Sequence, residues 1–228
     1  MEFRVKHEPV FSIVEFDLNA DESIMAQPNS MLTMTSAIHI KATVGRGKKS
    51  GWMSGFGSLL GGESFFTAEF SAKKDGQTVT LAPDSYGDIV VIDLQDAGGF
   101  YLTRGSYLAN SGDCELKTKY GGVKGLMSKK GLFLLHASGE GTVFCQTYGA
   151  VVDRMLDEGE VFFVDNRFVV AFSDTVQYQL VKATDSVKDS LMSGEGLVNR
   201  YTGPGRLIYQ TRGKPGAGII GHLIDAAT

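Results

Sequence analysis

The sequence predicts an all-β protein made of three tandem units, each a β-sandwich or double-stranded β-helix module, arranged with pseudo-threefold symmetry. Three observations support this fold class. The apolar runs are short and rich in Val, Ile, Phe, Tyr and Thr, and turn-forming residues separate them. Helical periodicity that lasts three turns is scarce. A segment near residue 140 also recurs near residue 205, as expected for an internal repeat.

The strand-like runs follow one another along the whole chain. The 29 glycines among 228 residues, without a collagen-like period, indicate many turns and bulges between them. Two segments, 185–193 and 218–227, are candidates for short helices. The predicted strands are, in order, SIVEFDL, SFFTAEFSA, TVTLA, DIVVIDL, GFYLT, GLFLLHA, TVFCQTY, EVFFVD, RFVVAFS, VQYQLVKA and RLIYQTR.

One half of the repeat is SGEGTVFCQTYG (138–149), which matches TGPGRLIYQTRG (202–213) at an offset of 64. Residues 71–87 form a looser third copy with five extra positions. Since the matches include glycines, the copies are expected to share turns as well as strands. The identical positions are Gly139, Gly141, Gln146, Thr147 and Gly149, matched by Gly203, Gly205, Gln210, Thr211 and Gly213.

The other half of the repeat occupies residues 18–34, 94–110 and 156–172. Each copy begins with Leu and continues through an acidic turn, a strand, a tight turn and a second strand. From the Leu to the second strand the intervals are 13, 13 and 12 positions (Leu18 to Met31, Leu94 to Tyr107, Leu156 to Phe168).

The order of these halves predicts how the chain closes. Residues 62–118 and 131–183 are expected to form two complete units, and residues 1–44 plus 194–213 the third. The last strand, RLIYQTR, is then expected to pair with or pack beside the N-terminal region. Such closure would satisfy the N–H and C=O groups of the terminal strands. Residues 45–61 form a glycine-rich loop between units, and residues 214–228 a C-terminal tail.

The composition limits the classes of protein to which this chain can belong. A net charge of −4, from 22 basic and 26 acidic residues, argues neither for a nucleic-acid-binding protein nor for an acidic tail, and nucleic acid is not an expected partner. Charges interrupt the first apolar runs, so no signal peptide is expected, and no run approaches the ~20 apolar residues of a membrane-spanning helix. The two cysteines, Cys114 and Cys145, make neither a disulfide framework nor a zinc site. We therefore expect a cytoplasmic protein.

The stretch GRGKKSGWMSGFGSLLGG (45–62) is a candidate contact site. It does not fit a P-loop, because Lys48 occupies the position of the last glycine and no helix-forming segment follows. Its large apolar residues predict a loop that covers a barrel end or a subunit seam. The alternatives are contact with a partner or a membrane surface, and a plain linker. The residues concerned are Trp52, Phe56, Leu59 and Leu60.

A second candidate surface is the lysine-rich segment 117–130. It contains no acidic residue, so it could contact anionic lipid or nucleic acid. A solvated loop is the preferred interpretation, because Tyr120 is the one aromatic residue there that could stack on a base. The lysines are Lys117, Lys119, Lys124, Lys129 and Lys130.

No catalytic, cofactor-binding or metal-binding residue is predicted. The string GAGIIG (216–221) lacks the βαβ unit of a dinucleotide site. Cys145 corresponds to Tyr209 in the other copy, which indicates a packing position and not a nucleophile. The histidines, His7, His39, His136 and His222, lack metal-ligand spacing. We therefore expect no enzyme, although a cupin-like metal-dependent enzyme remains an alternative if distant histidines converge.

Several of these segments resemble one protein family. GESFFTAEFSA, GDIVVIDL, RGSYLAN, GLFLLHASGEG, TYGAV and GEGLVNRYTGPGRLIYQTR are similar to bacterial relatives of the mitochondrial altered-inheritance protein twenty-four family. The resemblance runs from about residue 3 to residue 213, and its most specific part is GPG-x-L/V-x-x-QTR at 203–212. It implies a fold related to the tryptophan RNA-binding attenuation protein, and a homo-oligomer in which three chains would form a ring of nine units. It does not imply tryptophan or RNA binding.

The expected function is that of a non-enzymatic oligomeric scaffold or binding protein in the cytoplasm or at the membrane surface. A small-ligand-binding protein, with its ligand held between units, is the alternative.

Overall fold

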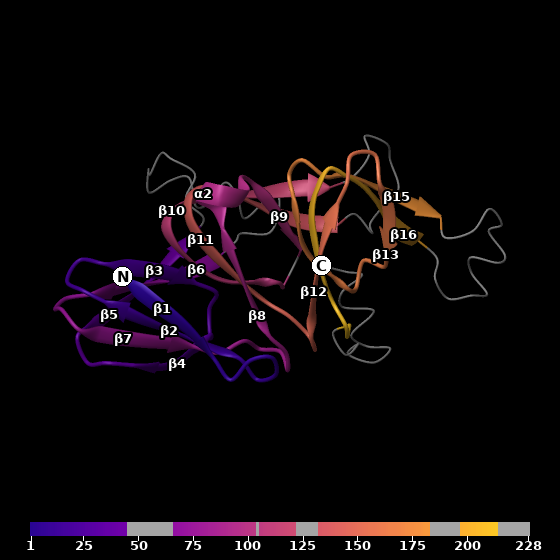
Figure 1. Cartoon of the computed structure of the whole chain (residues 1–228). Helices are drawn as coiled ribbons and strands as arrows, with labels where there is room; N and C mark the ends of the chain where they lie inside the picture. The colour runs from indigo at the N-terminus through magenta and orange to yellow at the C-terminus, as the bar shows by residue number, and fades with distance from the viewer. Residues whose placement is uncertain (45–65, 104, 122–131, 183–196, 214–228) are drawn as a thin grey trace.

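The computed structural model describes residues 1–44, 66–103, 105–121, 132–182 and 197–213. Within these ranges the protein is nearly all β, as predicted, and every strand ladder is antiparallel (Figure 1). One short helix, α2 (Leu94–Ala97), follows β8. The strands are β1 (Glu2–Lys6), β2 (Ile13–Leu18), β3 (Ser23–Ala26), β4 (Met31–Met34), β5 (Ile38–Val44), β6 (Phe66–Ala72), β7 (Gln77–Leu81), β8 (Ile89–Asp93), β9 (Phe100–Thr103), β10 (Tyr107–Gly121), β11 (Leu132–Gln146), β12 (Val151–Leu156), β13 (Val161–Val164), β14 (Val169–Ser173), β15 (Gln177–Lys182), β16 (Leu197–Thr202) and β17 (Gly205–Gln210).

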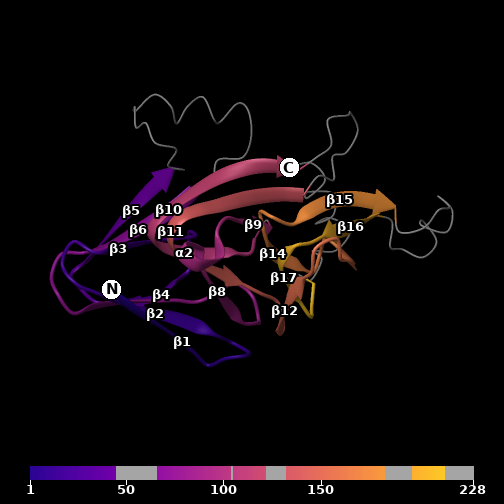
Figure 2. The same cartoon turned by 45° about the horizontal axis from the view of Figure 1, so that its top comes forward.

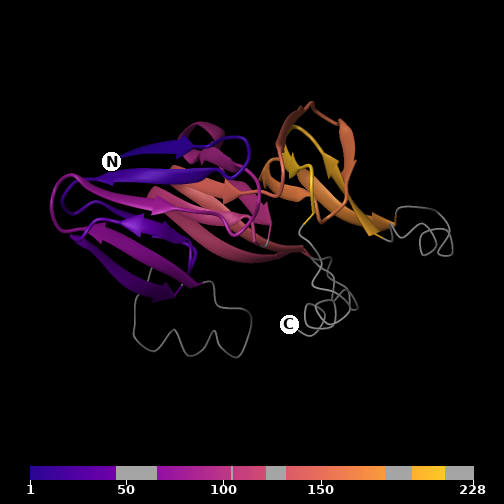
Figure 3. The same ribbon diagram turned by 90° about the horizontal axis from the view of Figure 1, so that it is seen from below.

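The strands make three sheets. A four-stranded sheet has the order β1-β2-β7-β4, and a three-stranded sheet has the order β13-β16-β15. A ten-stranded sheet has the order β12-β17-β14-β9-β11-β10-β3-β6-β5, with β8 paired to β11. Figures 2 and 3 show the N-terminal strands at one end of the molecule and β13 to β17 at the other.

One pairing pattern recurs in three stretches of the chain, which we call the first (β2 to β7), second (β8 to β11) and third (β12 to β17) strand sets. In the first set, β7 pairs with β2 and β4, and β6 pairs with β3 and β5. In the third, β17 pairs with β12 and β14, and β16 pairs with β13 and β15. In the second, the long strands β10 and β11 each take the place of two strands. Each set therefore contains two layers of three strands.

A register shift falls at the same point of each set. The ladder skips one residue after Met31 in β4, after Tyr107 in β10 and after Val169 in β14. Such a bulge bends the strand and increases its twist. The third-set counterpart of Tyr107 is thus Val169, and the predicted choice of Phe168 is one residue early. With this correction, all three intervals from the preceding Leu are 13 positions.

The predicted pairing of the chain ends is wrong. RLIYQTR forms β17, which pairs with β12 and β14, whereas β1 pairs with β2. The first set is completed locally instead, because β5 and β6 pair from Ile38 opposite Ala72 to Val44 opposite Phe66. Joining these nearby strands closes a shorter loop than joining the two ends of the chain, so it costs less conformational entropy.

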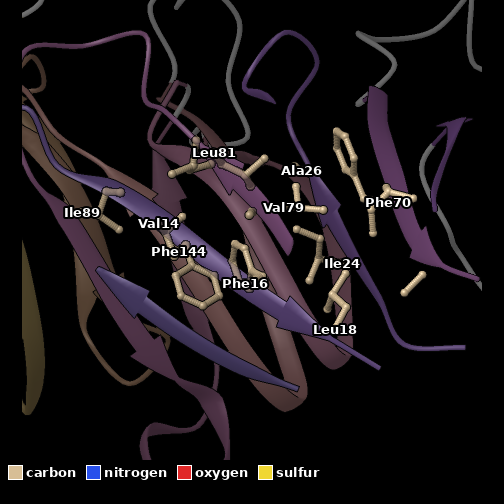
Figure 4. Packing of buried hydrophobic residues seen from close by; sticks show 14 residues of the cluster. Val14, Phe16, Leu18, Ile24, Ala26, Phe70, Val79, Leu81, Ile89 and Phe144 are labelled. Atoms are coloured by element: carbon tan, nitrogen blue, oxygen red, sulfur yellow. The ribbon is translucent and has the colours of Figure 1, made fainter. Parts of the chain in front are cut away.

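Burial follows the strand pattern. In β2 every second residue is buried, and these residues share the first core cluster with side chains from β3, β5, β6 and β7 (Figure 4). Phe144 of the second set enters the same cluster, where its ring lies 5.0 Å from that of Phe16 in an edge-on contact. Two further clusters fill the second and third sets. The core is therefore continuous across the junction between the first and second sets.

Neighbouring sets are joined by strand pairing in one register. At the first junction β10 pairs with β3, and Ala109 lies opposite Ala26. At the second junction β14 pairs with β9, and Ala171 lies opposite Leu102. The strand after the bulge in one set thus always adds to the sheet of the set before it.

Candidate functional site

The predicted contact residues are only partly described by the structure. Trp52, Phe56, Leu59 and Leu60, together with Lys124, Lys129 and Lys130, lie outside the described residues. Lys117 is exposed on β10, and its Nζ atom lies 2.8 Å from a carboxylate oxygen of Glu115. Lys119 is on the same strand, opposite Leu134. Since Glu115 offsets the charge of Lys117, this part of the lysine segment is not a purely basic surface.

The described residues hold no group of three or more His, Cys, Asp and Glu side chains placed to bind a metal ion. His136 contacts Asp174 instead, with Nε2 3.3 Å from a carboxylate oxygen, and its ring lies 4.8 Å from that of Tyr101. His39 is on a different strand, β5. His136 therefore links the second strand set to the third.

Both cysteine side chains pack inside the protein, and the pKa of each thiol is raised. Cys145 is fully buried in the second core cluster, and burial raises the pKa of its thiol to about 12. Cys114 is half-buried, and burial raises its pKa to about 11. At neutral pH both thiols are protonated, and a protonated thiol is a poor nucleophile.

The geometry instead singles out two sheet edges, one at each end of the series of strand sets. In the part of the chain that the structure describes, β4 pairs only with β7, and β13 pairs only with β16. Their counterparts pair on both sides: β10 and β14 correspond to β4, and β3 and β9 correspond to β13. Figure 1 shows β4 and β13 far apart on the molecule. We call β4 and β13 the open edges.

The open edge at β4 exposes apolar side chains that are buried elsewhere. Leu32 is 53% exposed, whereas its counterparts Leu108 and Val170 are 0% and 1% exposed. Met31 and Met34 on the same strand are also exposed. A short strand that keeps the apolar sequence of a buried strand on both of its faces is an unusual surface for a monomer.

The open edge at β13 has the same character. Phe163 is 56% exposed, and Val161 also faces solvent. The second-set counterpart of Phe163 is half-buried Tyr101, whose ring lies 5.4 Å from Phe172 across the junction. Phe163 thus occupies a position at which an aromatic side chain meets a neighbouring set.

A repeated side-chain clamp also marks the junctions. The backbone N–H of Asp84 donates to Gln146 Oε1 at 2.9 Å, and that of Tyr148 donates to Gln210 Oε1 at 2.8 Å. The Nε2 atoms of the two glutamines donate to backbone carbonyls, 2.9 and 3.1 Å away. Each glutamine thereby ties its own set to the linker of the set before it. Ala82 holds the corresponding place in the first set, because its N–H makes the same backbone bond, to Ser30, that Gln146 makes to Ser106.

The sequence analysis detected the glutamine clamp as part of the repeat, but it missed the open edges. It treated EVFFVD as an ordinary strand and did not single out MLTM in β4. The available signal was that apolar residues fall on both faces of these short strands, a pattern of strands covered on both sides.

None of the described helices is long and apolar enough to span a membrane.

Comparison with known proteins gives concordant results. The model of the family described as Mitochondrial biogenesis AIM24 matches residues 3–212. An uncharacterised protein of Streptococcus pyogenes serotype M6 is 29% identical over 221 residues, which cover 92% of this chain and 86% of that protein. An X-ray crystal structure of a Streptococcus pyogenes protein superposes with a TM-score of 0.75 at 26% identity, over 93% of this chain and 94% of that chain.

Proposed function

The chain belongs to the family described as Mitochondrial biogenesis AIM24, and from that premise we propose that it is a non-enzymatic, homo-oligomeric scaffold. The observation that carries the proposal is the pair of open edges. Each exposes a strand of the type that pairs on both sides inside the chain. A second copy supplies the missing strand for each edge and removes the exposed side chains from water.

In this proposal the three strand sets are equivalent units related by pseudo-threefold symmetry. The support for this is the pairing pattern and the bulge that they share. Because β4 and β13 are different surfaces, the contact between chains is heterologous, and such contacts must close into a ring to avoid open filaments. Three chains, which together contain nine units, are the proposed closed form, as the family resemblance implies.

The proposed location is the cytoplasm, which is consistent with two free cysteines in the described residues. A membrane surface or a protein partner is the proposed contact of the glycine-rich loop at residues 45–61.

The first test is the molar mass of the purified chain in solution, by size-exclusion chromatography with light scattering at micromolar concentration. We expect a particle three times the 24.6 kDa mass of one chain. A strict monomer at this concentration contradicts the proposal.

A matched pair of variants locates the contact. Leu32→Asp places a charge on the open edge at β4 and is expected to yield folded monomers, because a buried unpaired charge disfavours assembly. Met155→Asp changes a side chain on β12 that is 67% exposed, and it should leave the assembly intact. If both variants assemble like the wild type, the contact does not use β4. Circular dichroism of each variant confirms that the chain has folded.

A further inference from the structure

We propose that two copies join head to tail, through antiparallel pairing of β4 of one chain with β13 of the next, in a defined register. In this register Thr33 lies opposite Val164, Met34 opposite Phe163, and Thr35 opposite Phe162. The inference rests on the proposed homo-oligomer and names the atoms at its seam.

The register follows from the two junctions inside the chain. In both, the first residue after the skipped one begins the pairing with the preceding set: Ala109 lies opposite Ala26, and Ala171 lies opposite Leu102. Thr33 is the corresponding residue of β4, since it resumes the ladder with β7 after the shift at Met31. Thr33 is therefore the residue of β4 that begins the pairing at the seam.

The partner residue on β13 follows from the same comparison. Ala26 and Leu102 each lie eight positions after a buried leucine, Leu18 or Leu94, that ends or follows the first strand of its set. In the third set that leucine is Leu156, so the corresponding residue is Val164. The ladders to the next strand agree, because Ala26 pairs with β6, Leu102 with β11 and Val164 with β16.

The side chains fit this register. A small residue faces an aliphatic one at the seam, Thr33 opposite Val164, as Ala171 faces Leu102 inside the chain. The next pair, Met34 and Phe163, takes the place of Phe172 and Tyr101, whose rings are in contact. A methionine sulfur against an aromatic ring is a favourable contact, and both side chains are exposed in the single chain.

The backbone geometry allows a covalent test. The N–H of Gln27 donates to the carbonyl of Leu108 at 2.8 Å, so Ala26 and Ala109 form a non-hydrogen-bonded pair of the ladder. Thr33 and Val164 would form such a pair too, with Cα atoms about 4.5 Å apart. A disulfide accepts Cα separations of roughly 4.4–6.8 Å.

The experiment oxidises the double variant Thr33→Cys/Val164→Cys and counts disulfide-linked chains by non-reducing electrophoresis. Because β4 and β13 lie at opposite ends of one chain, a bond between the new cysteines links two chains. We expect most of the protein to become linked dimers and trimers that thiol reduction reverses. The wild type, whose thiols are buried (Cys145) or half-buried (Cys114), and each single variant should stay unlinked. Met34→Cys/Val164→Cys, one residue out of register, should link poorly, because Met34 follows Thr33 in the regular part of the ladder and its side chain points to the other face.

The cross-linking pattern and the molar mass of the wild-type protein in solution together distinguish the outcomes. If the protein is an oligomer and the single variant Thr33→Cys forms linked dimers, then β4 of one chain pairs with β4 of another. This result overturns the head-to-tail inference, while the scaffold proposal stands. An oligomer in which the out-of-register variant links better overturns the register. A monomeric wild type overturns both proposals.

Discussion

Gln146 shows how one side chain holds two strand sets together. Its amide accepts from the backbone of Asp84, in the linker of the first set, and donates to the carbonyl of Gly105 at 2.9 Å and to Gln27 at 3.1 Å. The side chain is buried, so water does not replace these bonds when they are lost. Gln210 makes the corresponding bonds at the second junction but is only half-buried.

Gln146→Ala is expected to lower the free energy of unfolding by about 1–3 kcal/mol, because it removes several hydrogen bonds made by a buried side chain. Gln210→Ala removes the matching bonds at a wetter site and should cost less. Urea unfolding followed by circular dichroism measures both. Equal losses for the two variants would contradict the assignment of the difference to burial.

The buried thiol of Cys145 makes stability depend on alkaline pH. Burial raises its pKa in the folded chain to about 12 from the ordinary value of 9.0, so between these values the folded state keeps a proton that the unfolded state loses. The free energy of unfolding should therefore be unaffected by this group below pH 9 and fall above it, by up to about 1.4 kcal/mol per pH unit. Urea unfolding from pH 8 to pH 11 measures the slope, and Cys145→Ala should make it shallower. An unchanged slope in that variant would show that Cys145 does not contribute.

At the scale of elements, β4 and β14 are the same strand in different surroundings. Both pair with the last strand of their set and carry the same bulge. Phe172 of β14 is fully buried among Tyr101, Tyr178 and Tyr201, whereas Met34, its counterpart on β4, is exposed. The difference arises because β14 has β9 beside it and β4 has no such neighbour within the described part of the chain.

Phe172→Ala should therefore cost about 3–5 kcal/mol of chain stability, the usual range for a buried phenylalanine. Met34→Ala should change chain stability by less than about 0.5 kcal/mol and act instead on assembly. Chemical unfolding and light scattering separate the two effects. A large loss of chain stability in Met34→Ala, measured under conditions where the protein is monomeric, would mean that β4 is not an open edge.

The sequence predicted where the strands are more reliably than it predicted which strands pair with one another. Alternating burial along β2 and the repeated glycines and glutamines are visible in the residues, because strand period and turn chemistry are local. The choice of partner strand is not local. On pattern alone, β17 could pair with the N-terminal strands or with strands of its own part of the chain. The structure shows that β17 pairs with β12, and that β5 and β6 pair with each other, so the first set closes without β17. The candidate site was missed for the same reason, since an open edge is defined by which strand is absent beside it.

At the scale of the whole molecule, the chain is a row of three strand sets with unlike ends. Each internal junction combines strand pairing, a shared core or ring contact, and a glutamine clamp. The contact proposed between chains reproduces the strand pairing but lacks the clamp, since Ala82 has no side-chain amide. The seam between chains is thus expected to be weaker than the junctions within them.

Amide hydrogen exchange of the unmodified protein tests this account most directly, because it reports whether the outer N–H groups of β4 and β13 are bonded. At concentrations where the protein is assembled, the account predicts slow exchange in both strands, comparable to that of β3 and β9, and faster exchange after dilution. Fast exchange in β4 and β13 at every concentration would contradict it.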